Sequence, residues 1–162
     1  MKRIAKVVWS EGMFLTPHLL QQADDYHEGL VHLRSSLLRP FCWGLTGLEI
    51  DREGLANGEV ALLRCSGILP DGLPVQIPDG DAAPESRSIK PHFSPSTDKV
   101  EIYLAIPMIR PGSANFNLAG ADGGRPVRYR AELSRVTDET AEGNESEILL
   151  ARKNFKILFS GE

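Results

Sequence analysis

The sequence has little that would support redox, nucleic-acid or membrane chemistry. Its only cysteines, Cys42 and Cys65, lie in apolar surroundings, so we expect buried free thiols in a reducing compartment, with a disulfide as the alternative. Its 18 basic and 22 acidic residues give a net charge of −4, which provides no electrostatic reason to expect nucleic acid. Glu11 and Gly12 interrupt the first apolar residues before a signal peptide could form, and no apolar run is long enough to cross a bilayer. These absences predict a cytoplasmic protein without direct membrane insertion.

The sequence also lacks the spacings of catalytic and metal sites. The four histidines are His18, His27, His32 and His92. Three share one predicted helix, but separations of nine and five residues do not give the i, i+4 pairing that metal binding favours. Ser66 lacks the glycine two residues before it that a nucleophile elbow needs. The glycine-rich stretch 120–125 has no phosphate-loop lysine and predicts a hairpin turn. We therefore expect no enzyme activity, no metal and no cofactor.

One long helix is predicted over residues 16–39. Thr16 is a good N-cap whose hydroxyl can accept a backbone N–H, Pro17 suits the first helical position, and Pro40 ends the helix. Apolar residues then follow at alternating spacings of four and three, the pattern of a heptad seam. The seam consists of Leu19, Ala23, Tyr26, Leu30, Leu33 and Leu37. Such a seam packs on a sheet of its own chain or pairs with copies of itself, and the sequence leaves both open.

The segment before the helix, residues 1–15, is predicted to be an extended arm. Its apolar side chains are Trp9, Met13, Phe14 and Leu15. They either fold back onto the core, because exposed aromatic side chains are costly in water, or offer contacts to a partner, because aromatic and Met side chains dominate interface energy.

Residues 40–162 predict about seven strands joined by turns, without the alternation of strand and helix that parallel sheets require. In the first strand, apolar residues alternate imperfectly with small or polar ones, the pattern of a half-buried strand; they are Phe41, Trp43, Leu45, Leu48 and Ile50. Gly44 and Gly47 indicate a bulge or a close backbone approach in this strand. The stretch 79–98, rich in Pro, Ser and Asp, predicts a long surface loop. The predicted fold is therefore a single mainly β domain over residues 1–162: an antiparallel β-sandwich with one long N-terminal α-helix.

The stretch WSEGMFLTPHLLQQADDYH closely resembles the opening of the TssK family of type VI secretion baseplate proteins, also called VasE or ImpJ. The stretches PFCWGLTGLEID, RCSGILPDGLPVQIP, IYLAIPMIRPG and RYRAELSRVTDET follow in the family's order, so the resemblance covers essentially the whole chain. Leu19 departs from it, since many relatives have a polar residue or a second histidine there. Family members continue through a helical neck into a C-terminal head, and nothing here corresponds to either. The chain thus resembles an isolated N-terminal shoulder domain.

The resemblance implies a structural adaptor whose β-sandwich is similar to the shoulder of siphophage receptor-binding proteins. It implies a homotrimer that docks onto a baseplate wedge of TssF and TssG, while the absent head contacts a membrane complex. Residues 9–15 then become candidates for partner contact or trimer locking, and the heptad seam becomes a candidate for the trimer axis. The alternative is a β-sandwich ligand-binding or carbohydrate-binding domain, although the sequence has no paired carboxylates or aromatic platform in one loop cluster.

Overall fold

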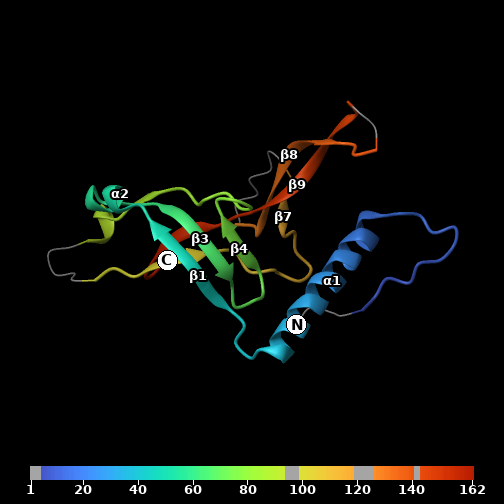
Figure 1. Cartoon of the computed structure of the whole chain (residues 1–162), viewed down its shortest axis with the longest axis horizontal. Helices are drawn as coiled ribbons and strands as arrows, with labels where there is room; N and C mark the ends of the chain where they lie inside the picture. Colours follow the sequence, from blue (N-terminus) through green and yellow to red (C-terminus); the bar gives the residue numbers. More distant parts are fainter. Residues whose placement is uncertain (1–4, 94–98, 119–125, 141–142) are drawn as a thin grey trace. The chain divides into compact units, whose positions relative to one another are not determined.

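A computed structural model describes residues 5–93, 99–118, 126–140 and 143–162 of the chain. Contacts divide the chain into two compact units. Unit 1 comprises Met1–Leu45 and Gly67–Pro74, and unit 2 comprises Thr46–Ser66 and Val75–Glu162. Most of the regular structure is β strand in small antiparallel sheets, with one long helix (Figure 1). The predicted mainly β class with a single long N-terminal helix is therefore confirmed.

The long helix α1, Pro17–Leu38, belongs to unit 1 and matches the predicted range to within one residue at each end. Thr16 is the N-cap and Pro17 follows it, as predicted, because a fixed proline φ suits the first helical position. The predicted role of the Thr16 hydroxyl is wrong, since its side chain makes no cap hydrogen bond. Instead the Thr16 carbonyl accepts from the Leu19 N–H at 3.1 Å. Backbone geometry therefore starts this helix without a side-chain cap.

The first sheet has three strands in the order β1-β3-β4. Its members are β1 (Gly44–Ile50), β3 (Leu62–Ile68) and β4 (Pro74–Ile77). A Cβ on Gly47 would lie 2.8 Å from Ser66 Oγ, and one on Gly67 would lie 2.8 Å from Leu45 Cα. The close approach to the backbone of the first strand is thus made by Gly67 of β3, whereas a Cβ on Gly44 would meet nothing within 4 Å and one on Gly47 would meet only a side chain. A short helix α2, Arg52–Ala56, follows β1, capped by the Asp51 carboxylate.

Two further strand pairs belong to unit 2. Strand β2 (Glu59–Val60) pairs antiparallel with β5 (Arg87–Ser88), and a 3₁₀ turn, η1 (Lys90–His92), follows. The long surface loop predicted over 79–98 is irregular over most of its described residues, but it contains β5 and η1, because tertiary pairing with β2 overrides the Pro- and Ser-rich composition. Residues 94–98 lie outside the described residues. Strand β6 (Ile102–Ala105) pairs antiparallel with β10 (Lys156–Phe159).

The last sheet has the order β7-β8-β9. Strand β7 (Phe116–Asn117) pairs parallel with the start of β8 (Tyr129–Thr137), and β8 pairs antiparallel with β9 (Glu145–Lys153) along nine residue pairs. Figure 1 shows β8 and β9 as a long twisted ribbon. The chain ends in two strands, β9 and β10. The turn predicted at 120–125 lies outside the described residues.

The core of unit 2 is formed largely by strand residues whose side chains alternate between buried and exposed positions. Strands β4 and β10 bury every second side chain, the period of a half-buried strand. The buried apolar residues are Val60, Leu62, Cys65, Val75, Ile77, Phe155, Ile157 and Phe159. Both cysteines are free, so the disulfide alternative is wrong. Cys65 is buried, which raises the pKa of its thiol through desolvation, whereas Cys42 is only half-buried, contrary to the expectation.

Candidate interaction surfaces

The beginning of the arm contacts α1, while the apolar side chains of the arm stay uncovered. The Gln22 side-chain amide donates to the Ala5 carbonyl at 3.2 Å, and Lys6 Nζ lies 5.6 Å from the centre of the Tyr26 ring. Gly12 takes a positive φ of 78° where the arm turns. The four predicted contact residues are nevertheless all exposed, Phe14 most of all at 88% of its surface. The arm therefore has a beginning that is held against α1 and apolar side chains that remain exposed.

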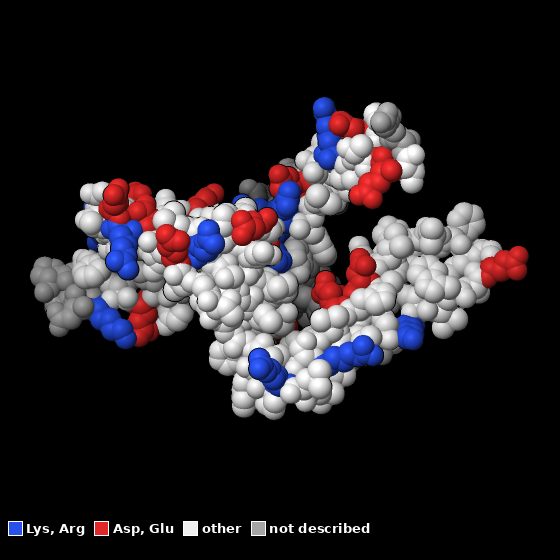
Figure 2. Space-filling view, viewed as in Figure 1, with Lys and Arg blue, Asp and Glu red and all other residues white. Residues whose placement is uncertain are grey.

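The heptad seam of α1 divides into two parts. Its first four residues, Leu19, Ala23, Tyr26 and Leu30, are half-buried. Its last two, Leu33 and Leu37, are exposed, with 74% of the Leu37 surface in contact with solvent. Figure 2 shows the visible face of the arm and α1 as largely uncharged. In this chain alone the C-terminal end of the seam, Leu33 and Leu37, is the part left uncovered.

Unit 1 exposes further apolar residues besides those of the arm and the seam. They include Val8, Leu20, Val31, Leu38, Phe41 and Trp43. Phe41 takes a φ of +61°, which is uncommon for a residue with a side chain, and its ring faces solvent. Sequence reasoning assigned Phe41 and Trp43 to a half-buried strand. Strand β1 begins only at Gly44, so both residues lie in the connection after α1.

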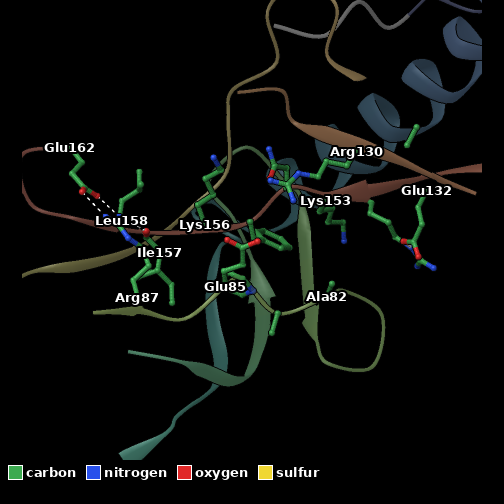
Figure 3. A pocket seen from close by; sticks show the side chains of 16 residues that line it. Ala82, Glu85, Arg87, Arg130, Glu132, Lys153, Lys156, Ile157, Leu158 and Glu162 are labelled. Carbon is green, nitrogen blue, oxygen red and sulfur yellow. Dashed lines mark hydrogen bonds and ion pairs between the residues drawn. The ribbon is translucent and has the colours of Figure 1, made fainter. Parts of the chain in front are cut away.

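Unit 2 contains a groove of about 870 Å³ whose walls are charged (Figure 3). Sequence reasoning missed it, because the lining residues come from segments far apart in the chain. They belong to the stretch 82–87, to the start of β8, to the β9–β10 junction and to Glu162. Five of them are basic, namely Arg87, Arg130, Arg152, Lys153 and Lys156, and three are acidic, namely Glu85, Glu132 and Glu162.

Ion pairs neutralise some of these charged side chains. Arg152 Nε donates to Glu132 at 2.8 Å across the β8–β9 pair, and Lys153 Nζ lies 2.9 Å from Asp81 Oδ1. Arg130 and Lys156 form no ion pair with any residue that the structure describes. The groove thus retains two uncompensated cations beside the single unpaired carboxylate of Glu85. This balance favours an anionic occupant.

One end of the groove is closed by Arg87 and Glu162. Arg87 donates to both carboxylate oxygens of Glu162, at 2.8 Å for Nη2, and to the Ile157 carbonyl at 2.9 Å. The Glu162 carboxylate also accepts the Phe159 N–H at 3.1 Å. These bonds, the Arg87 contact first, lower the pKa of Glu162 to about 2. The pair satisfies outward-facing backbone groups of β10 and so blocks its free edge.

Neither metal nor catalytic chemistry gains support from this geometry. Within the described ranges, no three His, Cys, Asp or Glu side chains gather closely enough to hold a metal ion. His92 stacks on Phe159 with ring centres 4.0 Å apart, so it is a packing residue. No helix in the part of the chain that the structure describes is long and apolar enough to cross a membrane.

A mainly β fold with one long helix and extensive exposed apolar surface is typical of a protein that binds other proteins. Comparison with known proteins identifies the family. Residues 18–162 match the family described as bacterial type VI secretion, VC_A0110, EvfL, ImpJ and VasE. The chain belongs to this type VI secretion family. It is 35% identical over 155 residues to the type VI secretion system baseplate component TssK1 of Pseudomonas aeruginosa PAO1. That match covers 94% of this chain and 34% of the relative, so the chain spans about a third of the relative's length.

Solved structures have the same fold. A crystal structure of TssK matches with a TM-score of 0.83 at 29% identity, covering 99% of this chain and 35% of that one. A chain of the type VI secretion TssK-TssF-TssG baseplate subcomplex, solved by cryo-electron microscopy, matches with a TM-score of 0.85 at 23% identity. That match covers 99% of this chain and 52% of the other.

Proposed function

We propose that the chain is a non-enzymatic structural domain of a type VI secretion baseplate, located in the cytoplasm. In this proposal it self-associates and docks onto a wedge of TssF and TssG. The observation that carries the proposal is the apolar surface of the arm and α1, which no described residue covers. Two comparisons add support: TssK1 is a baseplate component, and a chain of the same fold comes from a complex of TssK, TssF and TssG.

The arm is proposed as the partner contact. Large apolar side chains dominate interface energy when they enter pockets, and a backbone already held in place loses less entropy on binding. Phe14 and Leu15 are exposed, and they lie between the α1 helix start and the beginning of the arm, which is bonded to α1 at Ala5. We expect Phe14→Ser with Leu15→Ser to weaken co-purification with TssF and TssG. Leu55→Ser, on an exposed apolar residue of α2, is the matched control.

An arm variant that co-purifies as well as the parent chain would reject the contact role of the arm. Circular dichroism of both variants reports whether the β structure is intact. A loss in the Leu55→Ser control as well would indicate a general effect of removing surface leucines, and it too would contradict the arm's specific role.

The exposed end of the α1 seam is proposed as the self-association surface, with a homotrimer as the expected state. Leu37 is the residue to change, since Leu30 is half-buried within the chain and its loss would also affect folding. Light scattering should give a mass above the monomer for the parent chain and a lower mass for Leu37→Asp. A monomeric parent chain at high concentration would refute self-association through this surface.

The family resemblance assigns contact with a membrane complex to a head domain, which would lie outside the region matched here. We infer that the 162 residues act together as the shoulder domain of that arrangement. The groove of unit 2 has charged walls where carbohydrate sites use aromatic ones, so it gives no support to the carbohydrate-binding alternative.

A further inference from the structure

The β8–β9 ribbon leaves apolar side chains uncovered on both of its faces. Leu133 and Leu149 are directly paired on one face, and they are 58% and 51% exposed. Val136 and Ile148 lie exposed on the other face. Among the described strands, β9 is also an edge, with no neighbour beyond β8. A two-stranded ribbon in water is marginally stable by itself, so this one gains stability from a covering surface.

The far end of the ribbon is acidic. Between Val136 and Ser146 the sequence has four acidic residues and no basic one; they are Asp138, Glu139, Glu142 and Glu145. Glu142 lies outside the described residues. The Asp138 carboxylate shapes the turn, because it accepts from the Thr140 hydroxyl at 2.6 Å, from the Thr140 N–H at 2.8 Å and from the Asn144 side-chain amide at 3.1 Å. These bonds lower the pKa of Asp138 and keep it charged. Figure 2 shows acidic side chains at this end.

Glu139 and Glu145 are the free charges of this tip. Both are exposed, and neither forms an ion pair with any described residue. The base of the same ribbon borders the basic groove, where Arg130 and Lys156 are likewise unpaired within the described chain (Figure 3). The chain therefore has two exposed surfaces of opposite charge, because in the groove only Glu85 offsets the two unpaired cations.

The tip cannot reach the groove of its own molecule. Arg130 precedes Asp138 by eight residues along β8, which at about 3.4 Å per residue is roughly 27 Å of extended strand. Paired strands cannot fold back over that distance without breaking their ladder. The charge complementarity is therefore usable only between molecules.

We propose that the acidic tip of the β8–β9 ribbon, with Glu139 and Glu145, seats in the basic groove of a second copy of this chain, beside Arg130 and Lys156. The contact deepens the proposed self-association and rests on it, but it uses none of the α1 residues. Docking in this way lays the ribbon's apolar faces along the neighbouring copy, which covers Leu133 and Leu149. Since the contact is electrostatic at an exposed site, it weakens as salt rises.

Cross-linking with a carbodiimide tests the contact directly, because this reagent joins a carboxylate to an amine only when the two touch. Equal amounts of the 162-residue chain labelled with ¹⁴N and with ¹⁵N are mixed, and cross-linked peptides are identified by mass spectrometry. We expect peptides of mixed isotope that join Glu139 or Glu145 to Lys156, and several-fold fewer of them when salt is raised from about 50 to about 500 mM. Lys156→Arg keeps the charge but removes the amine, so it should abolish this cross-link. Lys90→Arg, on an exposed lysine that does not line the groove, should leave it unchanged.

A charge exchange gives an independent readout. The groove variant Arg130→Glu with Lys156→Glu and the tip variant Glu139→Lys with Glu145→Lys should each associate less than the parent chain in sedimentation velocity. A mixture of the two should associate again, because the inverted tip then meets the inverted groove. All four positions are exposed, and circular dichroism confirms that the variants fold.

The outcomes separate this contact from the α1 seam. A mixed-isotope cross-link that persists in Leu37→Asp supports a ribbon contact independent of α1. A parent chain that yields no such cross-link, while Leu37→Asp still lowers its mass, rejects the ribbon contact and leaves the α1 proposal standing. Cross-links that carry only a single isotope, with no mixed species, place tip and groove in one molecule and overturn the inference. A mixture of inverted variants that stays monomeric also overturns it.

Discussion

The ion pair between Lys153 and Asp81 offers the sharpest test of how the base of the ribbon is held. Lys153 is the last residue of β9, and its Nζ lies 2.9 Å from Asp81 Oδ1 and 3.0 Å from Oδ2. Asp81 Oδ2 also accepts the Gln76 N–H at 2.8 Å. Only 7% of the Asp81 side chain is exposed, against 21% for Lys153. The pair therefore ties the ribbon to the segment after β4 through a charge that water hardly reaches.

Removing the lysine and removing the aspartate of this ion pair leave different groups behind. Lys153→Met leaves the buried carboxylate with the Gln76 N–H but without its cation, which should lower the free energy of unfolding by roughly 3 to 5 kcal/mol. Asp81→Asn still offers Gln76 an acceptor, and the remaining ammonium group has more access to water. We expect that variant to lose only about 1 to 3 kcal/mol. The double variant, which has no buried charge, should be more stable than Lys153→Met alone.

Urea unfolding of the parent chain, both single variants and the double variant completes the cycle. For a chain of this size each kcal/mol corresponds to roughly 2 to 4 °C in the thermal midpoint, so Lys153→Met should be evident in a melt as well. Equal losses in the two single variants, or a double variant whose loss is the sum of both, would refute the reasoning. Either result would mean that the carboxylate is solvated despite its geometry.

Three further predictions concern stability. Because the pKa of Glu162 is lowered to about 2 from 4.5, its contribution is complete above about pH 4.5 and is lost as pH falls toward 2. Glu162→Gln should therefore be less stable than the parent at pH 6 in urea, and the difference should vanish near pH 2. Gly72→Ala should lower the thermal midpoint, because the φ of Gly72 is +85° and the new Cβ would lie 2.8 Å from His32 Cγ. Adding His32→Ala to this variant should recover only the part of the loss that the clash with His32 causes, and not the part that the positive φ causes. Phe159→Ala in the core should cost about 3 to 5 kcal/mol, whereas Phe14→Ala should stay within about 0.5 kcal/mol.

Local signals in the sequence sufficed for most of the secondary structure. Thr16, Pro17 and Pro40 delimit α1 because they act on backbone geometry within a few residues, and the helix follows them closely. Gly44 and Gly47 indicated a close backbone approach in β1, but the glycine that makes it is Gly67 of the neighbouring strand, which the sequence pattern did not single out. Strand β5 was not predictable in the same way. It exists through pairing with β2, which is remote in sequence, and its own residues favour a loop.

For the candidate surfaces too, the sequence predicted one part and the structure decided the other. The arm and seam residues could be selected from their apolar character, and their role as contacts remains a prediction. Their exposure could not be read from the sequence, since the pattern that marks a partner-binding face also marks a face buried in its own chain. The structure separates Leu30, which is half-buried, from Leu37, which is exposed.

The sequence by itself determined the mainly β class, the single long helix and the family, because hydrophobic period, capping residues and motif order are local properties of the chain. Only the tertiary structure decided where the charges meet. The groove joins residues 82–87 with residues 130–132 and 152–158, and the acidic tip lies a full strand length from it. Such an arrangement depends on which strands pair, and strand pairing is fixed by burial across the whole fold rather than by any one stretch of sequence.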